Sequence, residues 1–238
     1  MERLELFYED ALISKDRILE TAEDVTPEIE NVRSIVSKGY SDDRASVNLP
    51  DDEDMLRTVK SVIEEKLSLK PEYLIVIGIG GSNLGTIAVQ EAVLGRLYNL
   101  STSKIKVLFA DTVSSDIIGS IIRIVKPTLR EKGNVLLNVV SKSGITTETI
   151  ANFRILLDLL RKYKKEYKDY VVATCDRDSK LWKLAVKEEF ATLEIPRKVG
   201  GRYSVFSPVG LFPLGVLGIN IEDLLMGAKE MRDRCITT

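Results

Sequence analysis

The chain has 238 residues, with 34 basic and 36 acidic side chains and a formal net charge of −2. This balance provides no excess positive charge for a nucleic acid or an anionic membrane surface, so neither is expected as a partner. The sequence contains no histidine, which excludes Ser-His-Asp sites, Cys-His sites and histidine-ligated metals within these residues. Its two cysteines, Cys175 and Cys235, indicate neither a disulfide framework nor a zinc site.

The hydrophobic residues are not gathered into a membrane segment. No run approaches the roughly 18 apolar residues that a transmembrane helix needs. The first five residues are mostly charged and lack the apolar core of a signal peptide. We therefore expect a cytoplasmic protein.

Residues 1–70 show helical periodicity and many charges, and they predict a helical N-terminal extension. Pro27 suits the first turn of a helix, and Gly39 suits the position after its end. Pro50 precedes four acidic residues, which complement the dipole at a helix start, so we interpret this charge run as a helix start and not as a metal site. Three helices are expected here, over residues 4–20, 27–38 and 50–67.

From Pro71 onward, short apolar runs alternate with helical segments. Strands that are apolar throughout and are separated by helices predict a parallel sheet covered on both faces. The fold class is therefore α/β, a three-layer α/β/α sandwich over residues 71–238. Five strands are expected, at 73–79, 105–110, 134–140, 170–174 and 191–195, with helices between them near 82–96, 114–125, 146–167 and 178–188. A buried irregular helix over 205–219 and an amphipathic helix over 221–234 should follow.

Ligands of such sheets bind beyond the carboxyl ends of the strands, which makes three loops the candidates for function. The first, residues 78–85, is rich in glycine and opens a helix. A dinucleotide fingerprint would need glycine at 83, where the chain has Asn83. Asp111, at the end of the second strand, keeps a nicotinamide-dependent dehydrogenase as a remaining alternative. The other alternative is an ordinary tight turn.

The second loop, residues 141–149, combines serine and threonine hydroxyls with Lys142 and Gly144. It lies between the third strand and a helix, where free backbone N–H groups and the helix dipole favour an anion. A phosphate site and an ordinary hydroxyl-capped helix start both fit this pattern. The third loop is Gly200-Gly201-Arg202-Tyr203-Ser204, in which Arg202 could stabilise an oxyanion or bind backbone carbonyls.

These three motifs, in this order, resemble those of the glucose-6-phosphate isomerase family, over roughly residues 70–220. The 141–148 motif is also similar to that of the broader sugar-isomerase (SIS) domain family. The resemblance implies a SIS-type fold and a reversible isomerisation of glucose 6-phosphate and fructose 6-phosphate through an enediolate, in glycolysis and gluconeogenesis. It also implies that no metal or organic cofactor is needed.

The resemblance further implies roles for individual residues. Arg202 would stabilise the enediolate, and Glu148 matches a glutamate that orients a catalytic histidine in the family. The residues expected to bind substrate, most of them around its phosphate, are Gly81, Ser82, Ser141, Lys142, Ser143 and Thr146.

The chain also departs from the family. The proton-shuttling glutamate, the ring-opening histidine and a C-terminal lysine of the family lie after its arginine motif, in a second SIS domain that is absent here. We therefore expect the substrate-phosphate-binding half of the enzyme, with little or no activity alone. The alternative is a catalytically silent regulatory module that binds sugar phosphates. The expected partners are a sugar 6-phosphate and either a second copy of the chain or the missing half.

Overall fold

A five-stranded parallel sheet forms the centre of the molecule in the computed structural model, which describes residues 7–101 and 103–237. The strands lie in the order β2-β1-β3-β4-β5, and every neighbouring pair is parallel. Their bounds are Tyr73–Ile77 (β1), Lys106–Ala110 (β2), Val135–Val140 (β3), Val171–Cys175 (β4) and Ala191–Glu194 (β5). The five predicted strands are thus confirmed.

The strands were recognisable because they are covered on both faces. All six residues of β3 are buried, and so are all five of β4. A strand between two helical layers has no wet face, so its sequence is apolar throughout and does not alternate. The register pairs Ile77 of β1 with Val139 of β3, which brings the carboxyl ends of these central strands together.

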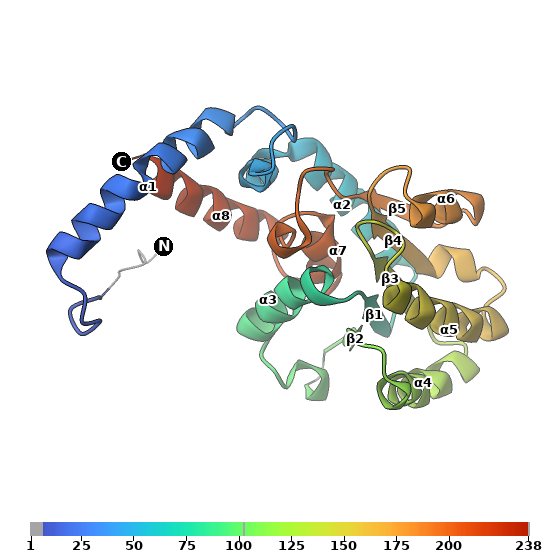
Figure 1. The fold of residues 1–238 in the computed structure, drawn as a ribbon. Coiled ribbons are helices and arrows are strands. Elements are labelled where there is room, and N and C mark those ends of the chain that lie inside the picture. The colour runs from blue at the N-terminus through green and yellow to red at the C-terminus, as the bar shows by residue number, and fades with distance from the viewer. Residues whose placement is uncertain (1–6, 102, 238) are drawn as a thin grey trace.

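Helices cover both faces of this sheet, as Figure 1 shows. One face carries α4 (Ser115–Arg130), α5 (Thr147–Tyr163) and α6 (Lys180–Lys187), whose apolar residues share a core with the sheet. The other face carries α2 (Glu53–Ser68), α3 (Leu84–Leu94) and α7 (Pro208–Val216). The predicted α/β/α sandwich is confirmed, including the buried helix α7, which contains Pro213.

The N-terminal extension is helical, but its elements differ from the prediction. The two helices expected over 4–20 and 27–38 are replaced by one, α1 (Lys15–Ile35), with Pro27 inside it. Residues 4–6 lie outside the described residues, and 7–14 contain no helix. Ser14 caps α1 by accepting a hydrogen bond from the Arg17 N–H. An exposed helix can absorb the bond that an internal proline removes, because water can solvate the freed carbonyl.

The third predicted helix is confirmed with a later start. A 3₁₀ segment, η1 (Ala45–Asp51), precedes α2. Asp52 then caps α2 by accepting from the Met55 N–H, and the acidic residues Glu53 and Asp54 lie in the first turn. The acidic run therefore begins a helix, as the sequence indicated.

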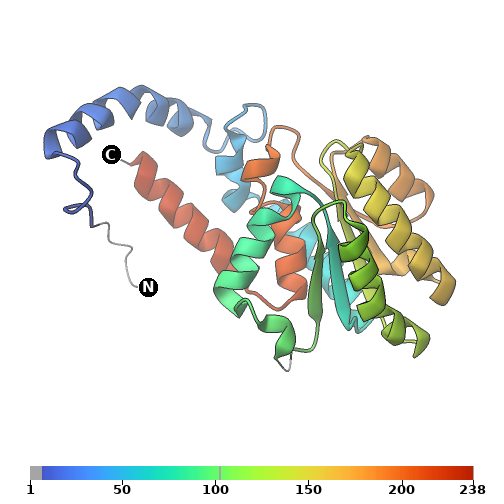
Figure 2. The ribbon, with the colours of Figure 1, turned by 60° about the horizontal axis from the view of Figure 1, so that its bottom comes forward.

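Helices α1 and α8 (Ile221–Ile236) lie side by side and extend away from the sandwich (Figures 1 and 2). The base of α8 is buried, through Ile221 and Leu225. Near its other end, the Arg33 Nε of α1 donates to the Ile236 carbonyl over 2.7 Å. Within the described residues, no helix combines the length and apolar character that crossing a membrane requires.

Candidate functional site at the carboxyl ends of β1 and β3

The strand order places the expected ligand-binding edge of the sheet between β1 and β3. From β1 the chain crosses to β2 on one side, whereas β3, β4 and β5 follow on the other. At such a switch point the loops after the two strands diverge and leave a crevice at the carboxyl edge. The loops after β1 and β3 are the glycine-rich loop and the 141–149 loop, so the fold brings the first two sequence motifs together.

The third motif packs directly on the first. A Cβ atom added to Gly81 would lie 2.3 Å from the carbonyl oxygen of Gly201, so the two backbones touch and no side chain fits between them. The Ser204 hydroxyl donates to the Gly201 carbonyl over 2.7 Å and lies 3.4 Å from the Gly81 carbonyl. The three motifs, separated by up to about 120 residues of sequence, therefore form one cluster.

Asn83, the residue that breaks the dinucleotide fingerprint, has a structural role in this cluster. Its side chain is fully buried, and its Nδ2 donates to the Gly78 carbonyl over 2.6 Å. A Cβ on Gly78 would lie 3.1 Å from the Val140 carbonyl, at the end of β3. Asn83 thus closes the glycine-rich loop on itself, at a position where a dinucleotide motif would need a glycine.

The 141–149 loop forms a compact turn whose hydroxyls lie at the start of α5. Ser141 is only 2% exposed, and its hydroxyl is 3.1 Å from that of Thr146. The Gly144 N–H donates to the Ser141 carbonyl over 3.0 Å. Gly144 has φ +67°, the left-handed region that glycine adopts without strain. The loop is closed by its own backbone, and the Ser141 hydroxyl donates to that of Thr146.

The start of α5 has no side-chain cap. Thr146 occupies the N-cap position, but its side chain makes no capping hydrogen bond within the described structure. By contrast, Ser114 and Ser179 cap α4 and α6 by accepting from the backbone N–H three residues on. The ordinary hydroxyl-capped start that the sequence allowed is therefore not observed at α5. Its first N–H groups are free for an anion, which the helix dipole also favours.

A further hydroxyl lies in the first turn of α5. The Thr149 Oγ1 is buried and has no hydrogen-bond partner among the described residues. Sequence reasoning assigned no role to Thr149, although it belongs to the same motif. The signal that could have identified it is its position two residues into a helix whose preceding turn already carries Ser141 and Thr146.

The side chain of Lys142, in the second motif, reaches the chain just before the third motif. Its Nζ donates to the carbonyl of Arg197 over 2.7 Å and to that of Val199 over 2.6 Å. The backbone of Lys142 is fixed as well, because its carbonyl accepts from the Asp176 N–H over 3.0 Å. Lys142 thus links the 141–149 loop to the chain that leads to Arg202.

Arg202 and Glu148 are both exposed. Arg202 makes no hydrogen bond or ion pair with any of the described residues, so the alternative of an arginine bound to backbone carbonyls is not observed. Its side chain lines a cavity of about 300 Å³ together with Tyr203, Pro50 of the η1 region and Arg232 of α8. Glu148 lies in the first turn of α5, beside the free N–H groups.

A polar cleft of about 580 Å³ adjoins the 141–149 loop on the side of β4 and β5. It is lined by Ser143, Asp176 and Arg197, among others. Burial raises the pKa of Asp176 above its ordinary value, although Lys142 opposes this, and one carboxylate oxygen is buried without a hydrogen-bond partner in the described structure. Asp176 was missed at the sequence level because a lone aspartate after a strand gives no signal of its own.

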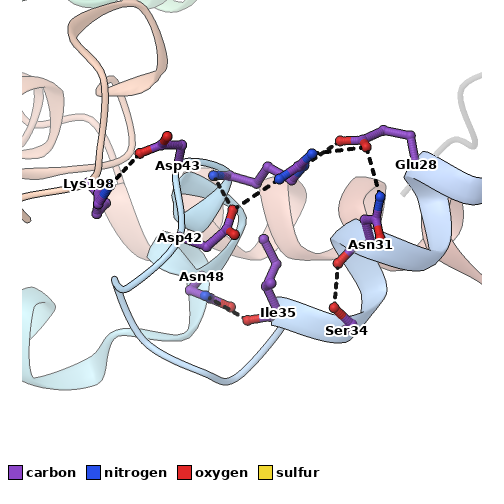
Figure 3. Close-up of polar contacts among 9 residues, drawn as sticks. Glu28, Asn31, Ser34, Ile35, Asp42, Asp43, Asn48 and Lys198 are labelled. Atoms are coloured by element: carbon purple, nitrogen blue, oxygen red, sulfur yellow. Dashed lines mark hydrogen bonds and ion pairs between the residues drawn. The ribbon is translucent and has the colours of Figure 1, made fainter.

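The loop between α1 and η1 connects the N-terminal extension to the chain just before the third motif (Figure 3). Lys198 forms an ion pair with Asp43 at 2.7 Å. The neighbouring Arg44 pairs with Glu28 of α1. Asn48 holds the loop itself, since its side chain accepts from the Ser37 N–H and donates to the carbonyls of Ile35 and Gly39. The chain before Arg202 is therefore held by Lys142 on one side and by this loop on the other.

The described residues contain no group of three or more Asp, Glu or Cys side chains placed to hold a metal ion. The groups at the β1/β3 edge are hydroxyls, backbone N–H groups and the ammonium of Lys142, whereas Arg202 lines the cavity beside η1 and α8. Such a donor set suits an anion with several acceptor oxygens, of which phosphate is the commonest.

Comparisons with known proteins find relatives over most of the chain. The sequence model of the phosphoglucose isomerase family matches residues 58–238. The glucose-6-phosphate isomerase of Leptospira biflexa is 41% identical over 201 residues, covering 81% of this chain and 43% of the relative. That of Carboxydothermus hydrogenoformans is 36% identical, with coverages of 79% and 40%. The chain thus spans less than half the length of the curated relatives it matches.

Solved structures show the same fold. A protein of Thermus thermophilus, described as hypothetical, superposes with a TM-score of 0.73 at 29% identity, covering 90% of this chain and 49% of the other. A glucose-6-phosphate isomerase of Chlamydia trachomatis superposes with a TM-score of 0.72 at 22% identity, covering 94% and 47%. With a family match over most of its length and relatives above one third identity, the chain belongs to the phosphoglucose isomerase family.

Proposed function

We propose that these residues form the substrate-phosphate-binding half of a glucose-6-phosphate isomerase. The observation that carries the proposal is the uncapped start of α5, which lies beside the hydroxyls of Ser141 and Thr146 at the switch point of the sheet. Helices α4 and α6 are capped by serines of their own, whereas α3 and α5, which follow the two strands of the switch point, have no side-chain cap. A sugar 6-phosphate has the charge and the hydroxyls that such an edge can bind.

The proposed roles follow from the placement of each group. Ser141, Ser143, Thr146 and one donor of Lys142 bind the phosphate together with the free N–H groups of α5. Gly81 and Ser82 lie on the adjacent loop, where the sugar would extend. Arg202 is exposed and free to turn toward the sugar, where its guanidinium would stabilise an enediolate oxygen. Glu148 would orient a histidine, which these 238 residues do not contain.

The test of the phosphate site is calorimetric titration with 6-phosphogluconate, using Ser141→Ala and Thr146→Ala. Each variant loses a hydrogen bond to a charged group, which is worth about 1.5–3 kcal/mol, so each should weaken binding by about tenfold or more. Thr147→Ala is the matched control, because Thr147 is exposed on the same helix turn and has no proposed role. Unchanged affinity in both site variants would refute the assignment.

A polypeptide of these 238 residues should show little or no isomerase activity, even if it binds 6-phosphosugars. The proton transfers of an aldose–ketose isomerisation need a general base and an acid for ring opening, and no histidine is available for either. We propose that activity requires a second SIS domain, supplied by further chain or by a partner. We also propose that the protein is cytoplasmic. Turnover of fructose 6-phosphate at an enzyme-like rate by this polypeptide alone would contradict the proposal.

A further inference from the structure

Lys142 connects the two loops that the proposed reaction would use. One is the phosphate loop, residues 141–146, and the other is the arginine turn, residues 197–203. A lysine ammonium has three N–H donors. Two of them are taken by the carbonyls of Arg197 and Val199, over 2.7 and 2.6 Å. One donor therefore remains, on a residue that directly follows Ser141.

We infer that Lys142 is a positioning residue that couples the binding of phosphate at the phosphate loop to the placement of the arginine turn. This inference rests on the proposed function, because it takes the phosphate to bind at the start of α5. A phosphate oxygen that accepts the third donor fixes Nζ from a third direction. The two carbonyls that Nζ holds are then fixed too, and with them the backbone that leads to Arg202.

Two other contacts of the arginine turn do not involve the phosphate loop. Lys198 is paired with Asp43 of the N-terminal extension, with both side chains largely exposed (Figure 3). Gly201 rests on Gly81 of the glycine-rich loop. Among the described residues, Lys142 makes the hydrogen bonds that join the phosphate loop to the turn. The coupling must act in both directions, so a fixed turn should also strengthen phosphate binding.

A purely structural lysine would hold the turn equally with and without ligand. The two roles differ in one measurable respect, which is whether the order of residues 197–203 depends on phosphate. Amide hydrogen exchange reports this order, because amides exchange as their local structure opens. The full 238-residue chain can be measured with no ligand, with inorganic phosphate and with 6-phosphogluconate.

In the unmodified chain, saturating phosphate should slow exchange in both residues 141–149 and residues 197–203. The slowing in the turn should be roughly fivefold or more, the lower end of typical couplings between sites. In Lys142→Met, compared at equal occupancy set by calorimetry, the slowing should remain in 141–149 and disappear from 197–203. Lys198→Ala is the control, because it removes the outer contact of the turn but keeps Lys142. It should exchange faster without ligand and still respond to phosphate.

The outcomes separate the two proposals. If phosphate slows exchange in neither segment, the phosphate site itself is wrong. If it slows 141–149 but not 197–203 in the unmodified chain, the phosphate site stands and the coupling is refuted. A turn that still responds to phosphate in Lys142→Met at equal occupancy also refutes the coupling. The first two results need no variant, so the inference can be tested even if Lys142→Met does not fold.

Discussion

The starts of α5 and α6 follow neighbouring strands, point to the same edge of the sheet and are built differently. At α6 the Ser179 hydroxyl accepts from the Trp182 N–H, so the protein satisfies the helix start itself. At α5 Thr146 makes no such bond, although it could by chemistry. Its hydroxyl lies 3.1 Å from that of Ser141 instead. Two helix starts that look alike in sequence therefore divide into one closed start and one open start.

This difference shows that a hydroxyl residue before a helix does not always cap it. A hydroxyl residue before a helix predicts a cap in most proteins. What changes its role here is a second hydroxyl, Ser141, which the turn at Gly144 places beside Thr146. The same glycine packs on the α6 start, since a Cβ on it would lie 2.7 Å from the Leu181 nitrogen. The turn before α5 therefore packs against the start of α6.

Gly144→Ala should have the largest effect, because it disturbs both starts at once. Alanine there combines a left-handed backbone, which costs about 1–2 kcal/mol, with a collision against α6, which costs about 1–3 kcal/mol more. Chemical denaturation should show a loss in the free energy of unfolding equal to the sum of these two costs. Phosphate binding should also be lost. Gly39→Ala is the matched control, since its φ of +70° is close to that of Gly144 but no described atom lies within 4 Å of the added Cβ. Equal losses in both variants would show that the starts do not pack tightly.

Ser179→Ala and Ser141→Ala should separate stability from binding. Removing the cap of α6 should lower the free energy of unfolding by about 1 kcal/mol and leave phosphate affinity unchanged. Ser141→Ala should weaken phosphate binding and change the free energy of unfolding less, because its hydroxyl caps no helix. Thermal melts and phosphate titrations of both variants provide the measurement. If Ser179→Ala weakened binding as much as Ser141→Ala, the contrast between the two starts would be wrong.

Asp176→Asn should produce a smaller, pH-dependent gain in stability. Burial raises the pKa of Asp176 in the folded protein above its ordinary value of 3.8, so the ionised form opposes folding. This penalty is absent at low pH, develops as pH rises through the two pKa values and is complete at neutral pH. The variant should therefore melt higher than the unmodified chain at pH 7 and equally near pH 3. A gain that persisted at pH 3 would point to a cause other than charge.

Asp43→Asn should have the smallest effect on stability. Its ion pair with Lys198 is exposed, and such pairs are weak and screened by salt. The pair also holds the pKa of Asp43 below its ordinary range, so its contribution is present above that range and is lost as pH falls through the lowered pKa. The melting temperatures of the variant and the unmodified chain should differ slightly at low salt and become equal at high salt. A difference that survives high salt would contradict this description.

The sequence was sufficient to predict the sheet and the three loops. Buried parallel strands such as β3 are apolar throughout, and the carboxyl ends of such strands share an edge by geometry. The N-terminal helices were predicted less well, because Pro27 is a helix-start signal that an exposed helix can override. Local patterns carry no information about how far a solvated helix extends past a tolerated proline.

The contacts inside the site were beyond prediction. The partners of Lys142 are carbonyls some 55 residues away in the chain, and a carbonyl has no sequence signature. Whether Thr146 would cap α5 or face Ser141 depends on the turn between them and not on residue type. The exposure of Arg202 likewise depends on how η1 and α8 surround its cavity.

The helix α1 has a consequence for how this molecule opens. It is 21 residues long, yet none of its side chains is buried. A segment that contributes little to the core can unfold by itself at low free energy while the sandwich stays intact. We therefore expect two cooperative units, with α1 in the weaker one. Arg44 pairs with Glu28 of α1, and the neighbouring Asp43 pairs with Lys198 of the arginine turn. Unfolding of the weaker unit should therefore loosen the arginine turn before the sandwich itself unfolds.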